Sequence, residues 1–122
     1  KVIIGAVHEI VELSYAAYSQ NDIRAAKCVE PLEQVIDNLK EKLRTRHIER
    51  LQAGGCTIEA GFIWSDLLNN LERVSDHCSN IAGCVIEMAH NSLDLHHYLK
   101  SIKEGKGEFV EDFERYSATY SV

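Results

Sequence analysis

Proline is nearly absent from this 122-residue chain, which has Pro31 alone, and glycine occupies only seven positions. No segment alternates polar and apolar residues with the period of two that is typical of a β-strand. With leucine, alanine, glutamate and lysine abundant, these absences favour long helices over short strands. We therefore expect an all-α protein, and a chain of this length is large enough for one continuous core.

Positive charge is also scarce, with 13 Lys and Arg against 19 Asp and Glu and a net charge of −6. Nucleic-acid binding needs a basic surface that displaces counterions, so we expect no nucleic-acid partner. The basic residues between Lys40 and Arg50 alternate with acidic and apolar ones, as on a solvated helix face. No signal peptide or membrane-spanning run is present, so we expect no direct membrane insertion of this chain.

The four cysteines lack the C-x-x-C spacing of a zinc knuckle. We expect Cys28, Cys56, Cys78 and Cys84 to be reduced thiols that pack as small apolar groups in the cytoplasm. The length fits a single domain over residues 1–122. The chain begins at Lys1 rather than at methionine, so we expect it to be a fragment of a larger protein.

Helical spacing of apolar residues predicts three long helices. The first covers about 2–19, after which Asn21 and Asp22 provide an end and a new N-cap. The second covers about 22–53, and Pro31 either kinks it or starts a new helix there. Gly54-Gly55 closes it, and Thr57 caps a third helix to about residue 90. The short turn makes the last two helices an antiparallel hairpin.

Shorter helical pieces are expected at about 93–103 and 108–120, with the second packed back on the bundle. Phe62 and Trp64 of the third helix are expected in the core. The fold class is therefore an antiparallel, up-down helical bundle of three long helices plus shorter C-terminal pieces.

A Glu-x-x-x-Asp motif occurs on both hairpin helices, as Glu33 and Asp37 and again as Glu72 and Asp76. Residues four apart lie on one face of a helix, where two carboxylates repel each other unless a cation lies between them. Both pairs lie at one edge of their apolar stripes and at similar distances from the turn. Glu30 falls on the same side of the second helix and is the candidate fifth member.

Carboxylates that converge at one level of a bundle make an oxygen-rich site suited to iron, manganese, magnesium or zinc. The alternative is a solvated acidic edge, the usual reading of one such motif in an acidic helical protein. Arg73 and Asn80 are candidates for supporting the carboxylates from beside them.

The stretch DLLNNLERVSDHCSNIAG resembles the signature helix of PhoU domains, and the segment around Glu33, Ile36 and Asp37 resembles the partner motif. The resemblance covers roughly the whole chain as one PhoU repeat, and is nearest to the cytoplasmic C-terminal domain of sodium/phosphate cotransporter-related proteins. It implies a metal-binding regulator of phosphate uptake, with multinuclear iron first and zinc, magnesium or manganese as alternatives. The matching positions are Leu71, Glu72, Arg73, Asp76, Asn80 and Ile81.

The resemblance further implies that the partner is the rest of a membrane transporter chain, at the cytoplasmic face of the membrane, with phosphate as a possible ligand. Since one repeat is present where regulatory PhoU proteins carry two, a homodimer or upstream sequence is expected to complete the arrangement. Two other readings stay open. One is an interaction module without metal, and the other is a carboxylate-bridged metalloenzyme. No nucleophile–base pair supports the enzyme, so we expect no catalytic residues.

Overall fold

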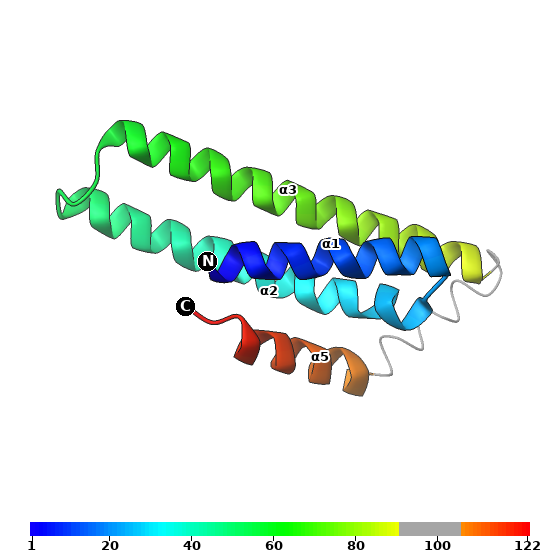
Figure 1. The fold of residues 1–122 in the computed structure, drawn as a ribbon. Helices are drawn as coiled ribbons and strands as arrows, with labels where there is room; N and C mark the ends of the chain where they lie inside the picture. The colour runs from blue at the N-terminus through cyan, green and yellow to red at the C-terminus, as the bar shows by residue number, and fades with distance from the viewer. Residues whose placement is uncertain (91–105) are drawn as a thin grey trace.

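The computed structural model of this chain describes residues 1–90 and 106–122 (Figure 1). Its helices are α1 (Val2–Gln20), α2 (Ile23–Gln52), α3 (Ile58–Ala89) and α5 (Lys106–Thr119). No strand occurs in these two ranges. The all-α fold class is confirmed, whereas the helical piece expected at 93–103 lies outside the described residues.

Local signals fix the helix ends where the sequence places them. Asn21 ends α1 in the left-handed conformation, with φ of 51°. The Asp22 carboxylate then accepts a hydrogen bond from the backbone N–H of Ala25 at 3.1 Å and caps α2. After α2, Gly54 adopts a φ of 75°, which favours glycine. The Thr57 hydroxyl accepts from the N–H of Ala60 at 3.1 Å and caps α3.

Pro31 does not start a new helix, because α2 runs through it. Proline inside a helix removes one backbone hydrogen bond and crowds the preceding turn. Pro31 and the neighbouring Leu32 are both fully buried. Their packing in the core offsets that cost.

The three long helices pack on one another in an up-down-up order, and α5 packs on α2 (Figure 1). Ile10 of α1, Ile36 of α2 and Leu68 of α3 are among the largest fully buried side chains, so each helix contributes to one core. Tyr120, just after α5, donates its hydroxyl hydrogen to Glu9 of α1. The α1–α2 junction is thereby covered by α5.

The turn end of the hairpin extends beyond α1, which is 19 residues long against 30 and 32 for α2 and α3 (Figure 1). Phe62 is 69% exposed because it lies on the side of α3 opposite the buried stripe, so its expected core position is wrong, while Trp64 packs partly against the core. A Cβ atom on Gly61 would lie 2.8 Å from Nε2 of the buried His47. The absence of a side chain at Gly61 lets α2 and α3 approach closely here.

A buried ionic cluster, which the sequence did not signal, attaches α5 to the start of α2. Asp112 of α5 is 2% exposed and accepts two hydrogen bonds from the Arg24 guanidinium, each at 3.1 Å. Arg115 lies 3.1 Å from the same carboxylate and stacks over the ring of Tyr116. The Cys28 thiol is 3.8 Å from Asp112, and burial raises its pKa. All four cysteines are free, as expected.

Replacing Asp112 with asparagine should destabilise the protein by about 1–3 kcal/mol. Breaking a buried ion pair costs more, but Arg24 and Arg115 are half exposed and water recovers part of their solvation. Urea unfolding measures the change, and amide hydrogen exchange should show faster exchange in α5. Glu111→Gln, an exposed change on the same helix, is the control and should leave both unchanged. Equal effects of the two substitutions would contradict the assigned role of Asp112.

Candidate functional site

Two polar contacts establish how α2 and α3 are aligned. The Ser79 hydroxyl of α3 donates to the Glu30 carboxylate of α2 at 2.7 Å. Two to three helical turns nearer the hairpin turn, the Lys40 ammonium donates to the Glu72 carboxylate. Positions 30 and 40 of α2 therefore lie level with positions 79 and 72 of α3. The antiparallel register predicted from the distances to the glycine turn is confirmed.

This register places the carboxylates of both motifs along the α2–α3 junction. We call them the carboxylate row, and their exposure differs from one position to the next. Glu33, Asp37 and Glu72 are half buried, whereas Glu30 and Asp76 are exposed. The row thus lies at the edge of the hairpin contact, where the helical spacing placed it. Its members are Glu30, Glu33 and Asp37 of α2 with Glu72 and Asp76 of α3.

Glu33 is the electrostatic centre of the row. Burial, the negative charges of Glu30, Asp76 and Asp37, and a hydrogen bond to Asp76 together raise the pKa of its carboxyl from 4.5 to about 7. Proximity of like charges disfavours ionisation, and each carboxylate that stays charged adds to the effect. Four of the five predicted residues are therefore brought into mutual electrostatic contact around one side chain.

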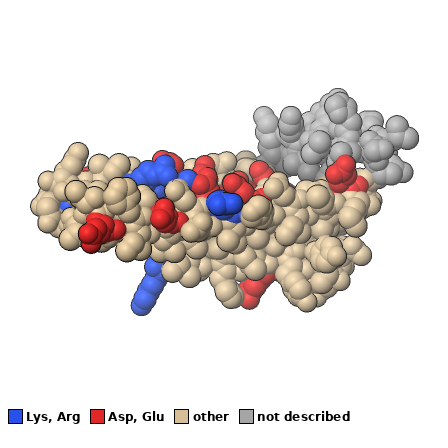
Figure 2. Space-filling view, turned by 90° about the horizontal axis from the view of Figure 1, so that it is seen from above, with Lys and Arg blue, Asp and Glu red and all other residues tan. Residues whose placement is uncertain are grey.

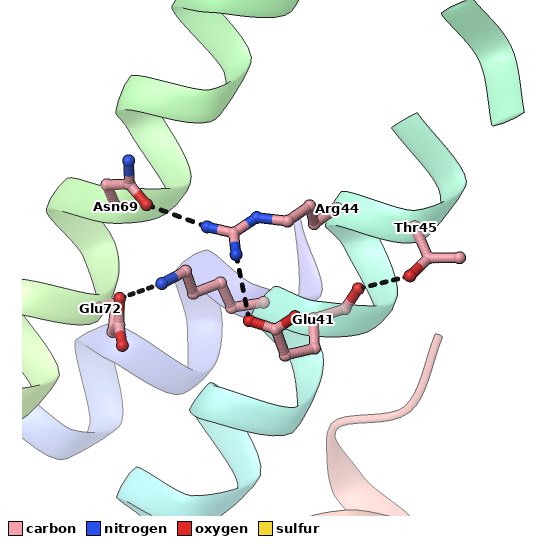
Figure 3. A network of polar contacts seen from close by, with 6 residues as sticks. Glu41, Arg44, Thr45, Asn69 and Glu72 are labelled. Atoms are coloured by element: carbon pink, nitrogen blue, oxygen red, sulfur yellow. Dashed lines mark hydrogen bonds and ion pairs between the residues drawn. The ribbon is translucent and has the colours of Figure 1, made fainter. Parts of the chain in front are cut away.

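Glu72 belongs to a different polar group at the other end of the row. Its partner is Lys40, which is only 7% exposed, so the expectation of a solvated basic face is wrong at this position. Figure 3 shows the neighbouring contacts, in which Arg44 donates to Asn69 of α3 at 3.2 Å and to Glu41 at 3.3 Å. Lys40 follows Asp37 by three residues, so the spacing that placed Glu33 and Asp37 together also places Lys40 with them.

The side chains do not at present converge tightly enough to hold an ion. Within residues 1–90 and 106–122, no three His, Cys, Asp or Glu side chains form a group that could ligate a metal. Arg73 and Asn80 are both exposed on α3, and their role beside the carboxylates stays a prediction. The arrangement can attract a cation, and the side chains must turn toward it to bind it.

Comparison with known protein families gives a match for the α2–α3 hairpin together with α1. Residues 3–85 match the PhoU domain. The chain belongs to the PhoU family. The matched range contains every member of the carboxylate row and ends before α5, so the PhoU domain proper is formed by α1, α2 and α3.

One curated relative is the phosphate-specific transport system accessory protein PhoU homolog 1 of Thermotoga maritima. It is 25% identical over 105 residues, which cover 86% of this chain and 45% of that protein. The chain therefore spans less than half the length of this relative. No solved structure matches the chain significantly.

The family resemblance read from the third helix is thus confirmed, and the relation to sodium/phosphate cotransporters stays a prediction. Within the described ranges, no helix has the length and apolar character needed to cross a membrane. The carboxylates around Glu33 lie inside the family-matched helices and make up their acidic cluster with a raised pKa.

Stability should depend on pH through Glu33. Because its folded pKa lies near 7 and above the unfolded value, it contributes stability below about pH 4.5 that is lost as pH rises through 7. Glu33→Gln should therefore be more stable than the wild type at pH 8, by about 1–2 kcal/mol after allowance for solvent screening. The difference should shrink toward pH 5. Urea unfolding at both pH values measures it.

Glu111→Gln on α5 is the control for this experiment, because Glu111 lies outside the carboxylate row. An advantage of Glu33→Gln that is the same at pH 5 and pH 8 would show that folding does not raise the pKa of Glu33. A loss of stability at pH 8 would contradict the analysis of the row outright.

Proposed function

We propose that this PhoU domain is a metal-binding regulatory domain in phosphate uptake, and that the carboxylate row is its metal site. The observation that carries the proposal is the crowding of three carboxylates around the half-buried Glu33. Such crowding costs folding free energy near neutral pH, and a bound cation would remove the cost. A protein gains stability from a ligand that binds the folded state alone.

The chemistry of the row suits hard or borderline cations, because every donor is a carboxylate oxygen. Iron is the first candidate, with zinc, magnesium and manganese as alternatives, in one or more ions. Glu30, Glu33, Asp37 and Asp76 would hold the ion, and Glu72 would join after leaving Lys40. Since the row draws on both helices, a bound ion would join α2 to α3, and Arg73 and Asn80 lie beside it.

The regulatory part of the proposal rests on the family. The Thermotoga relative is named as an accessory protein of a phosphate-specific transport system. We extend that role to this chain and place it at the cytoplasmic face of a phosphate transporter of the sodium/phosphate cotransporter type. Phosphate would bind to the domain at the bound metal. A catalytic role is not part of the proposal, because no nucleophile–base pair accompanies the row.

A second candidate function is an interaction module in which no metal takes part. The observation in its favour is that the chain already supplies partners for two members of the row. Lys40 neutralises Glu72, and Ser79 hydrogen-bonds to Glu30. In that case the row is a polar seam between two helices, and regulation depends on what the helix surfaces contact.

Metal binding to the purified chain distinguishes the two. After loading with iron, zinc, manganese or magnesium in turn and desalting, the wild type should retain at least one of them near stoichiometrically by elemental analysis. Glu33→Gln/Asp76→Asn should retain at least tenfold less, because it removes charge from the centre of the row. The same metal should raise the melting temperature of the wild type and leave that of the variant unchanged.

The matched control is Glu59→Gln/Glu111→Gln, which removes two exposed carboxylates outside the row and should bind as the wild type does. Retention of no metal by the wild type, with no change in melting temperature, would reject the metal site and leave the interaction module. Equal retention by both double variants would show adventitious binding to an acidic surface.

A further inference from the structure

Large apolar side chains remain exposed along two helices that are in contact with each other. On α1 they are 43 to 71% exposed, and on α3 they are 40 to 73% exposed. Monomeric proteins seldom leave apolar patches of more than a few hundred Å² uncovered. We call this set the α1–α3 face, and it comprises Ile4, Val11, Tyr15 and Tyr18 of α1 with Ile63, Leu67, Val74, Ile81 and Met88 of α3.

Contacts on each helix show that the two rows border the same junction. On α1, Gly5 and Glu9 face Tyr120 beside α5, and the exposed apolar row lies on the opposite flank of the buried stripe. On α3, Glu72 and Ser79 face α2, and the exposed row again lies on the opposite flank. Since α1 and α3 pack on each other, both rows flank the α1–α3 junction.

The other two junctions of the three-helix bundle are occupied differently. The α1–α2 junction is covered by α5, and the α2–α3 junction carries the carboxylate row. Figure 2 views the molecule from the α3 side and shows charged side chains gathered in a band, with a largely uncharged surface beside it. Exposed charged residues such as Glu12 of α1 and Asp66 of α3 lie at the outer edges of the α1–α3 face, not between its two rows.

The pattern on α3 fits another helix rather than a small molecule. Leu67, Val74, Ile81 and Met88 recur every seven residues, the repeat that keeps one seam of a helix against a partner helix. Nine side chains of this size and exposure present on the order of 1,000 Å², compared with about 800 Å² per partner in a standard stable interface. The face is therefore large enough to hold a dimer together.

We propose that the α1–α3 face is the surface through which two copies of this chain pack against each other. A second copy fits because, in a twofold-symmetric dimer, the apolar rows of the two copies pack against each other without burying unpaired charge. The chain also spans less than half of its Thermotoga relative, so two copies together contain about as much chain as that protein. The interface of the expected homodimer would then be the α1–α3 face, which is separate from the carboxylate row.

Sedimentation equilibrium of the 122-residue chain tests the proposal. The wild type should sediment as a dimer that dissociates on dilution. Val74→Glu/Ile81→Glu on α3, and separately Tyr15→Glu on α1, should each sediment as monomers, with at least a hundredfold weaker association. These positions are exposed, so helical circular dichroism should be unchanged and should show that the monomers are folded. Val110→Glu on α5, where Val110 is 46% exposed, is the matched control and should remain dimeric.

A wild type that stays monomeric at the highest soluble concentration would overturn the proposal, as would a dimer that Val74→Glu/Ile81→Glu leaves intact. Dissociation by Val110→Glu to the same extent would place the interface elsewhere. Dimerisation is measured without added metal, so failure of the dimer and failure of the metal site are separate results.

Discussion

The close antiparallel contact of α2 with α3 is the constraint on which the rest of this structure depends. Leu32, Ile36 and Leu39 of α2 pack into the core with Leu68 and Cys78 of α3. That apolar contact fixes the register of the hairpin, and the register in turn places carboxylates from both helices at one level. Burial of these apolar side chains thereby holds the carboxylates of α2 and α3 close together, although their negative charges repel each other.

The chain relieves part of this repulsion with its own groups. The Lys40 ammonium forms an ion pair with Glu72 at one end of the carboxylate row, and the Ser79 hydroxyl donates a hydrogen bond to Glu30. Burial and the remaining repulsion from Glu30, Asp76 and Asp37 raise the pKa of Glu33 to about 7. A group in this state responds to protons and to cations near physiological pH. The metal site that we propose for the row would give the domain a physical means of sensing ions.

Much of the fold was predictable from the sequence because its signals are local. Asp22 and Thr57 mark helix starts, Gly54 marks an end, and the apolar spacing of α2 and α3 sets the register that brought Glu33 near Asp76. What the sequence could not show depends on packing between distant segments. Pro31 stays helical because the core holds it. Phe62 is exposed because the bundle packs against the opposite side of α3. Lys40 is buried because Glu72 of another helix pairs with it.

The attachment of α5 through Asp112 could not be predicted from the sequence either, because its partner Arg24 lies far away in the chain. The helical periodicity of α3 predicted an apolar stripe but could not divide it between core and surface. That division follows from the lengths and positions of α1 and α5. It leaves the α1–α3 face uncovered and the α1–α2 junction filled.

The most direct test of the central claim is a carbon-13 NMR titration of the Glu33 side-chain carboxyl in metal-free protein and again with saturating magnesium or zinc. The account predicts a midpoint at about pH 7 without metal and a clearly lower midpoint with metal, because the cation replaces repulsion with attraction. A midpoint near 4.5 that metal does not move would show that the carboxylates of α2 and α3 neither strain the fold nor share an ion.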